Sequence, residues 1–171
     1  RDKLVTGVQT CALPISFMLG ELLRAAGESA DEELPGSVQS LVLARIDHLS
    51  SADREAVRAA SIFGRRFALD ALWGLLGKPD YRCEELVSHF LVRPEGEDYL
   101  FAHALVQEVV YGSLLKARRR ELHRMAAEWF AGRDLPLRAE HLDRAEDAKA
   151  PQAYLEAARD EAAGFRLGPA F

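Results

Sequence analysis

The hydrophobic positions of this chain recur mostly at helical spacing, and short polar or glycine-containing segments interrupt most of these periodic stretches. Apolar residues three and four apart predict helices over residues 17–26, 36–49, 50–63, 69–76 and 84–90. Ser50 and Asp53 have the spacing of a capping box, which marks the start of the third helix. Gly77 follows the fourth at a typical helix end. The apolar faces of these helices include Val38, Leu41, Val42, Ile46, Leu49, Val57, Phe63, Leu72, Leu86 and Phe90.

A short β-hairpin is predicted after these helices. Residues 91–93 and 99–101 are apolar β-formers, and Pro94, Gly96 and Asp98 lie in the segment between them. Several helices followed by one hairpin is the order of a winged helix. The pattern therefore predicts a mainly α fold with one two-stranded wing.

Helices return after the hairpin, over residues 104–115 and 116–131, and a break follows at 132–135. From Pro136 the alanine-rich stretch predicts a pair of helices whose small residues allow close approach, as in tetratricopeptide-type repeats. The predicted contacts in this part of the chain involve Leu105, Val109, Leu114, Leu115, Leu137, His141, Leu142, Ala145, Ala153, Tyr154, Ala157 and Ala158. About one such repeat is present.

The segment from Tyr99 to Leu115 runs from a strand through His103 directly into a helix. An imidazole at a helix start can donate a hydrogen bond to a phosphate oxygen, and nearby backbone N–H groups and the helix dipole add to such an anion site. A hinge of this kind can report on a ligand. The alternative is a histidine packed at the hairpin–helix junction and satisfied by backbone.

Composition favours a helical, cytoplasmic protein without a membrane span. The chain is 49% hydrophobic and 29% charged, its net charge is -5, and no apolar run approaches ~18 residues. Cys11 and Cys83 offer no disulfide framework. No Ser/His/Asp or Cys/His set is present, and His48, His89, His123 and His141 lack metal-ligand spacing, so we interpret each as a surface or packed histidine.

Residues 1–16 are set apart from the rest. The stretch from Val5 to Ile15 resembles the in-frame translation of a sequencing-library adapter and shows no helical or strand period. We therefore expect residues 1–16 to be an artefact, and exclude them from the fold prediction. The alternative is a native irregular loop.

From Phe17 onward the chain resembles bacterial STAND-class signal-transduction ATPases, the relatives of AAA-type ATPases that are fused to adenylate or guanylate cyclases or to transcriptional activators. The segments that carry the resemblance are residues 17–24, 34–49, 59–67, 101–111 and 118–124. The resemblance implies ATPase lid helices at 17–50 and a winged-helix domain at 51–115. It also implies a linker helix and the start of tetratricopeptide-like repeats at 116–171.

The resemblance further implies a function for a longer protein. There, an upstream ATPase domain would bind ATP or ADP, and this fragment would relay the nucleotide state to a cyclase or transcription-activator effector, with protein partners on the helical repeats. The chain itself departs from the family, because Pro14-Ile15-Ser16 stand where an adenine-contacting turn is expected and no phosphate loop occurs. We expect the fragment alone to bind no nucleotide and to hydrolyse none. Lys78 is interpreted as a helix-end cation.

Two residues are candidates for contact with the nucleotide of the longer protein. His103 resembles the histidine of a Met-His-Asp-like triplet that reaches the phosphates of bound ADP in related switch ATPases. Arg45, out of phase with the apolar stripe of its helix, could face nucleotide or lie on the surface. Gln107 and Glu108 cap or orient His103, or face water, and are assigned no chemistry.

Two other interpretations remain, a DNA-binding winged helix and a helical interaction scaffold. The predicted reading helix and wing carry acidic side chains that would repel DNA, which argues against DNA as a partner; these are Glu84, Glu85, Glu95, Glu97 and Asp98. The segment from Lys116 to Arg124 carries five basic residues, interpreted as a solvated face of a packed helix or, alternatively, as a phosphate-binding patch.

Overall fold

A computed structural model describes residues 36–166 of the chain. The chain divides into two units between Leu41 and Val42, and the fold below is that of the second. Residues 1–16, the helix predicted at 17–26 and most of the expected lid lie outside the described residues. Helix α2 (Gly36–Asp47) is the first described element.

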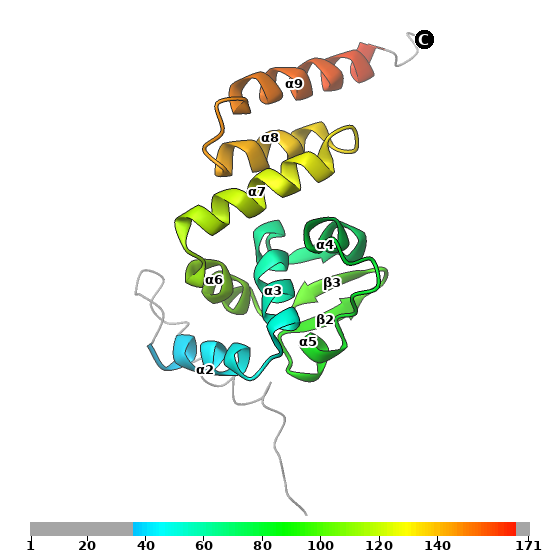
Figure 1. The fold of residues 1–171 in the computed structure, drawn as a ribbon. Helices are drawn as coiled ribbons and strands as arrows, with labels where there is room; N and C mark the ends of the chain where they lie inside the picture. The colour runs from blue at the N-terminus through cyan, green and yellow to red at the C-terminus, as the bar shows by residue number, and fades with distance from the viewer. Residues whose placement is uncertain (1–35, 167–171) are drawn as a thin grey trace, which may run out of the picture. The chain divides into compact units, whose positions relative to one another are not determined.

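The described elements confirm a mainly helical fold with a small antiparallel sheet (Figure 1). After α2 come α3 (Ser51–Ala60), the 3-10 turn η1 (Ser61–Phe63), β1 (Arg66–Ala68), α4 (Leu69–Leu76), α5 (Glu84–Ser88), β2 (Val92–Glu95) and β3 (Asp98–Phe101). Four further helices follow, α6 (Ala104–Ser113), α7 (Lys116–Phe130), α8 (Leu135–Arg144) and α9 (Ala150–Arg166). The order from α3 to β3 is the predicted winged-helix order.

The sheet has one strand more than the predicted hairpin. Strand β3 lies in the middle, and both neighbours run antiparallel to it, with Phe67 of β1 opposite Tyr99 and Val92 of β2 opposite Phe101. Strand β1 was missed because three residues are too few to show alternation, and because the strand lies directly before the helix predicted at 69–76. Its side chain is buried in the sheet and lies close to the rings of Tyr99 and Phe101.

Helices α3, α4 and α5 surround this sheet and form the core with it (Figure 1). The largest fully buried side chains of this core are those of Phe101, Ile62, Leu72, Leu86 and Leu91. Burying side chains of this size contributes about 1.5–3 kcal/mol each. The core therefore fixes where β3 ends and where α6 begins.

Several residues predicted for the apolar faces are instead exposed. Phe90 is 50% exposed because α5 ends at Ser88 and the backbone at Phe90 has a φ of 55°, which takes its side chain off the helical face. Leu115 is 79% exposed because it is the extended N-cap residue between α6 and α7. Leu41, Leu137, Tyr154 and Ala158 are also exposed, so these predictions were wrong.

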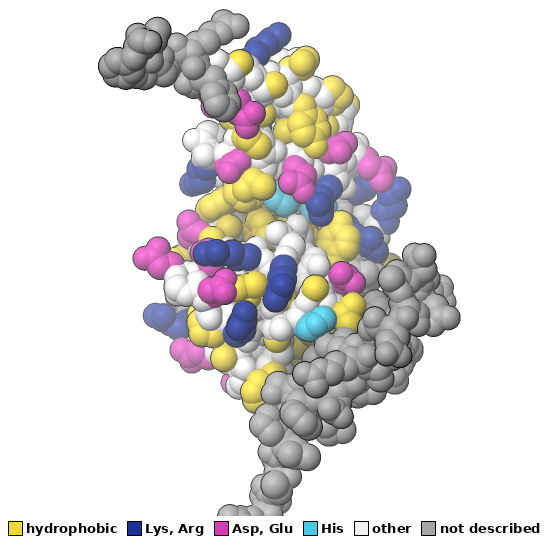
Figure 2. Space-filling model, turned by 180° about the vertical axis from the view of Figure 1, so that it is seen from behind, with side chains coloured by type: hydrophobic (Ala, Val, Ile, Leu, Met, Phe, Trp, Pro, Cys, Tyr) yellow, Lys and Arg dark blue, Asp and Glu magenta, His cyan; other side chains and the backbone are white. Residues whose placement is uncertain are grey.

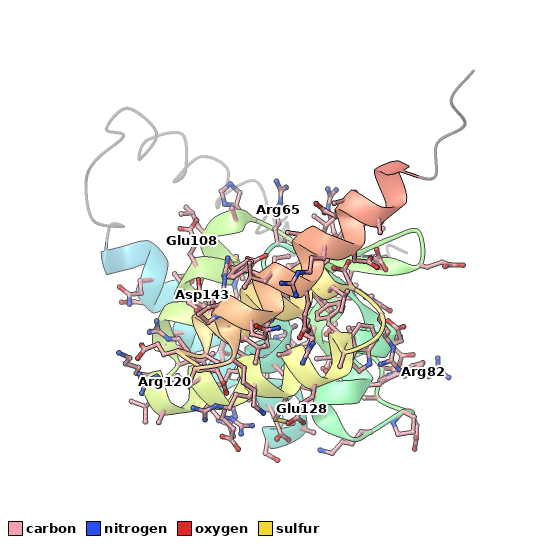
Figure 3. All side chains as sticks on the ribbon, turned by 90° about the horizontal axis from the view of Figure 1, so that it is seen from above. Arg65, Arg82, Glu108, Arg120, Glu128 and Asp143 are labelled. Carbon is pink, nitrogen blue, oxygen red and sulfur yellow. The ribbon has the colours of Figure 1, made fainter. Side chains whose placement is uncertain are left out.

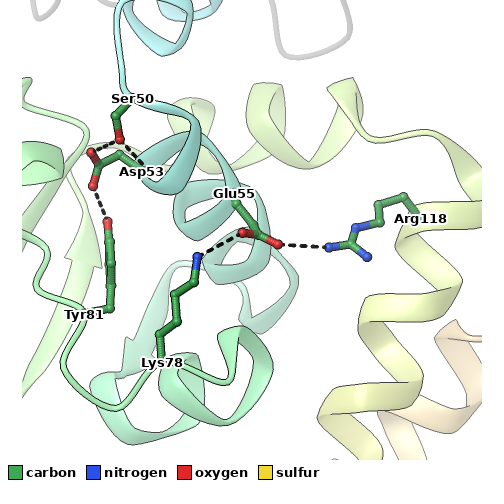
Figure 4. A network of polar contacts seen from close by, with 6 residues as sticks. All are labelled: Ser50, Asp53, Glu55, Lys78, Tyr81 and Arg118. Atoms are coloured by element: carbon green, nitrogen blue, oxygen red, sulfur yellow. Dashed lines mark hydrogen bonds and ion pairs between the residues drawn. The ribbon is translucent and has the colours of Figure 1, made fainter.

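The start of α3 is held by the cap that the sequence predicts. The Ser50 hydroxyl accepts a hydrogen bond from the Asp53 backbone N–H at 3.2 Å and donates one to the Asp53 carboxylate at 2.6 Å. The Tyr81 hydroxyl donates to the same carboxylate at 2.8 Å (Figure 4). Burial and this hydrogen bond raise the pKa of Tyr81, so its hydroxyl stays protonated. The protonated hydroxyl joins the loop before α5 to α3.

Helix α7 packs on α4 and η1 and also on α8, and α8 packs on α9. The chain reverses direction after α7 and again after α8 (Figure 1). The predicted close approach through small residues is confirmed, since a cluster of buried residues joins the three helices, namely Ala127, Ala139, Leu142, Ala150 and Ala153.

Gly74 lies at a close contact between α4 and α7, because a β-carbon added there would overlap the indole ring of Trp129. We predict that Gly74→Ala destabilises the fold by about 1–2 kcal/mol in chemical denaturation, since overpacking outweighs the gain in helix propensity. Gly112 in α6 is the matched control, because nothing lies within 4 Å of the position of its added β-carbon. Gly112→Ala should be neutral or stabilise by up to about 1 kcal/mol. Equal effects of the two changes would contradict the close contact.

Candidate functional site

His103 is the N-cap residue of α6, directly after the central strand of the sheet. Its backbone is extended, with φ -146° and ψ 150°, and its Nδ1 accepts a hydrogen bond from the backbone N–H of Leu105 at 3.2 Å. Because Nδ1 is an acceptor, the neutral ring carries its proton on Nε2. Nε2 makes no hydrogen bond to a residue in the described part of the chain, and the side chain is half-buried.

The backbone around His103 contributes less to an anion site than the sequence predicts. The Leu105 N–H is taken by the imidazole, and the Val106 N–H donates to the His103 carbonyl at 3.1 Å. The first turn of α6 therefore has two of its N–H groups already paired. The Nε2–H group and the dipole of the ten-residue helix remain for an anion.

The strand–helix junction that carries His103 is held by hydrogen bonds from several elements. Phe101 N–H donates to the Arg65 carbonyl at 2.9 Å, and Ala102 N–H donates to the Leu91 carbonyl at 3.0 Å. The Gln107 side-chain amide donates to the Ser61 carbonyl at 2.6 Å and so holds α6 against η1. Gln107 therefore positions the helix rather than capping His103.

Glu108 is exposed and extends outward from α6 (Figure 3). Gln107 and Glu108 were predicted to cap or orient His103 or to face water, and Glu108 faces water. Neither side chain makes a hydrogen bond to the imidazole of His103.

Arg45 is half-buried on α2 rather than freely exposed. One of its terminal nitrogens, Nη2, is enclosed and makes no hydrogen bond to any residue that the structure describes. Burial lowers the pKa of this guanidinium. Within the described part of the chain, Arg45 thus keeps a donor without an acceptor, while its predicted contact with nucleotide stays a prediction.

The basic side chains of α7 are all engaged, which supports a solvated, ion-paired face rather than a phosphate patch. Lys116 and Arg120 both pair with Glu146 in the loop between α8 and α9, and Arg124 lies 3.7 Å from Asp147 in the same loop. Arg119 lies over the ring of Tyr111 and donates to the Leu114 carbonyl at 3.0 Å.

The remaining basic residue of α7, Arg118, reaches across to α3. Arg118 lies 3.7 Å from Glu55, and Lys78 lies 3.5 Å from the same carboxylate (Figure 4). Lys78 follows the end of α4, as the sequence predicts for a helix-end cation. Exposed pairs of this kind contribute little stability individually, so their significance here is that they occupy the cations.

The wing and the helix before it present acidic groups. Asp98 and Glu95 pair with Arg66, whereas Glu84 and Glu97 are exposed and make no ion pair with another described residue. Helix α5 is only five residues long. Basic and acidic side chains alternate over the face shown in Figure 2, with no continuous basic area on that face.

Two buried histidines form a cluster that the sequence analysis missed. His123 on α7 and His141 on α8 approach with their Nδ1 atoms 2.9 Å apart, and the His123 Nε2 lies 3.1 Å from the Tyr111 hydroxyl. The sequence analysis interpreted each as a surface or packed histidine, and both are packed. Their meeting could not be read from the sequence, because it depends on how α7 and α8 pack against each other.

Burial lowers the pKa of both imidazoles, to about 3 for His123 and about 4 for His141. For His123 the neighbouring His141, Arg144 and Arg119 lower the pKa further, while Glu140 raises that of His141 and Arg144 lowers it. Both rings are therefore neutral at pH 7. The residues that the structure describes contain no group of three or more potential ligands for a metal ion.

Comparisons with known proteins assign no family to the chain. No protein-family profile and no solved structure matches it. An uncharacterized protein of Rhizobium meliloti (strain 1021) is 33% identical over 108 residues, which cover 57% of this chain and 10% of that protein. The chain therefore spans about a tenth of the length of this relative. Over the described residues, no helix is both long and apolar enough to span a bilayer.

The buried histidines should make stability fall at acidic pH. An unfolded imidazole binds a proton below about pH 6.5, whereas His123 and His141 resist protonation down to about pH 3 and 4, so the unfolded chain takes up more protons between these values. We predict that the free energy of unfolding falls by about 2 kcal/mol per imidazole from pH 7 to pH 5. Urea denaturation at both pH values measures it. His141→Phe should reduce this pH dependence, and an unchanged dependence in that variant would contradict the assignment.

Proposed function

We propose that this chain is the regulatory, signal-relaying part of a longer STAND-class ATPase that acts in the cytoplasm. In this proposal an upstream ATPase domain binds ATP or ADP, and the winged helix senses which nucleotide is present. Helices α7 to α9 carry the response toward an effector, a cyclase or a transcription activator. The chain itself supplies no phosphate loop.

The observation that carries the proposal is the position of His103 between β3 and α6. The imidazole closes the helix with Nδ1 and has Nε2–H available for an external acceptor such as an ADP phosphate. Its backbone is fixed by the sheet on one side and by the Gln107–Ser61 hydrogen bond on the other. A force on the imidazole would therefore act on α6, which leads into α7.

Two further observations support a relay. Helix α7 packs both on the winged-helix elements α4 and η1 and on α8, so a displacement of α7 changes both sides. The chain covers only 10% of the Rhizobium meliloti protein that it resembles, which is compatible with a segment of a multidomain protein. Protein partners would bind beyond α7, on the helical repeats.

The second candidate function is a helical scaffold that binds other proteins without nucleotide. The observation that favours it is the exposed pair Tyr154 and Leu155 on α9, where a further repeat or a partner could bind. It requires no role for His103. The DNA-binding alternative is weaker, because α5 is short and the unpaired charges at Glu84 and Glu97 are acidic.

Substitution of His103 in the longer protein separates its two roles. Asn is a good N-cap, so His103→Asn should preserve folding stability, whereas His103→Ala should cost about 0.5–2 kcal/mol. Both variants lack the Nε2 donor, and we predict that both accelerate ADP release about tenfold in stopped-flow measurements. If His103→Asn releases ADP at the unaltered rate, His103 is only a cap.

The acidic wing predicts that the chain does not bind DNA. A mobility-shift assay with double-stranded DNA at low salt should show no complex at micromolar protein, since phosphate neutralisation is absent. As a matched control, the double variant Glu84→Lys and Glu97→Lys should gain weak, salt-sensitive binding. Tight, salt-sensitive binding by the unaltered chain would instead favour the DNA-binding winged helix.

A further inference from the structure

A cleft of about 380 Å³ opens between the winged-helix elements and helices α7 and α8. Aromatic and aliphatic side chains from η1, β1, α7 and α8 line most of it, namely Phe63, Phe67, Trp129, Phe130, Leu137 and His141. Its volume lies within the range of about 300–1,000 Å³ that is typical of small-molecule sites. The cleft is separate from His103, whose side chain does not line it.

The rings of the cleft are oriented by contacts with each other. The imidazole of His141 stacks on Phe130 with ring centres 5.3 Å apart and planes 9° apart. Phe63 meets Phe130 edge-on at 6.1 Å, and Trp129 meets it edge-on at 4.8 Å. Phe63, Trp129 and Phe130 are only half-buried, so ring surface remains for a further aromatic ring.

His141 is the buried polar group of this cleft, since its side chain is only 5% exposed. Its Nδ1 is occupied by the 2.9 Å contact with Nδ1 of His123, and the other nitrogen of His123 is occupied by Tyr111. The Nε2 of His141 has no hydrogen-bond partner among the described residues. This nitrogen belongs to a largely buried side chain in the wall of the cleft, so a ligand that enters the cleft can complete its hydrogen bonding.

The Tyr111–His123–His141 chain lets this nitrogen act in either direction. When the Tyr111 hydroxyl donates to His123 and His123 donates to His141, the Nε2 of His141 carries the proton and donates. When His141 donates to His123 and His123 donates to Tyr111, the same Nε2 is an acceptor. Both arrangements are neutral, in agreement with the lowered pKa values of the two imidazoles.

The charged residues at this cleft also favour a neutral ligand. Arg66 and Asp98 both contribute to the lining, but the Arg66 Nε lies 2.7 Å from the Asp98 carboxylate, so their charges offset each other. The site therefore combines aromatic surface, one adaptable hydrogen-bonding nitrogen and no unpaired charge.

We propose that this cleft binds a neutral, planar heteroaromatic molecule, whose ring packs among Phe63, Trp129 and Phe130 and whose ring N–H or ring nitrogen hydrogen-bonds Nε2 of His141. The proposal is independent of the STAND-class function, because it requires neither His103 nor a nucleotide. A ligand seated there would contact α7 and α8 together with η1 and β1.

Indole and 1-methylindole test the proposal by NMR titration of the full chain. Both present the same ring system, but only indole has an N–H that can donate to His141. We expect saturable binding of indole that is about fivefold tighter than that of 1-methylindole, corresponding to one hydrogen bond of about 1 kcal/mol. Shifts should concentrate on residues that line the cleft. No saturable binding of either compound, or shifts located elsewhere, would overturn the proposal.

Two variants connect binding to the cleft. Leu137 is 37% exposed and lines the cleft, so Leu137→Trp should fill it and abolish indole binding. Leu155, 52% exposed on α9 and outside the cleft, is the matched control, and Leu155→Trp should bind indole normally. His141→Phe should remove the preference for indole over 1-methylindole. Because that variant also leaves Nδ1 of His123 without its partner and so perturbs the fold, Leu137→Trp decides the proposal: unchanged indole binding in Leu137→Trp contradicts it.

Discussion

Helix α7 has to be buried on two sides, and most of the described structure depends on how it meets that constraint. One side packs on α4 and η1, where Gly74 leaves room for the indole of Trp129. The other side packs on α8 through Ala127, whose small side chain lets the two helices approach closely. The basic residues of α7 remain at the margins, where they pair with acidic side chains instead of being buried. Elements η1 and α4 on one side and helix α8 on the other thus pack against the same helix.

That arrangement also determines where imidazoles lie. His123 and His141 are enclosed because they belong to the interface that α7 forms with α8, and they remain neutral because burial disfavours their charge. His103 lies at the other end of α6, where the strand–helix junction leaves it half-buried. The first two histidines are suited to packing and to recognition of a neutral ring, whereas His103 is suited to contact with an anion outside the chain. A relay from His103 to α8 would pass through α6 and α7.

Local patterns in the sequence predicted the elements well, and tertiary packing determined the rest. The Ser50 cap, the helix end at Gly77 and the hairpin around Gly96 follow from short-range rules, and the structure has all three. Strand β1 was missed because its partner β3 lies about 32 residues later and only pairing identifies it. The histidine pair and the aromatic cleft were missed for the same reason. His103 was located by its position at a helix start, but the pairing of the adjacent N–H groups required coordinates.

The proposed relay depends on His103, which closes α6 through Nδ1 and leaves Nε2–H for an external acceptor. Long-range ¹H–¹⁵N correlation spectra of the imidazoles at pH 7.5 report this directly, since they distinguish the protonated nitrogen from the unprotonated one. The Leu105 hydrogen bond predicts that His103 carries its proton on Nε2 and that its Nδ1 is unprotonated, with the signal assigned by its loss in His103→Asn. A His103 ring with its proton on Nδ1 would contradict both the cap and the donor that the proposed phosphate contact requires.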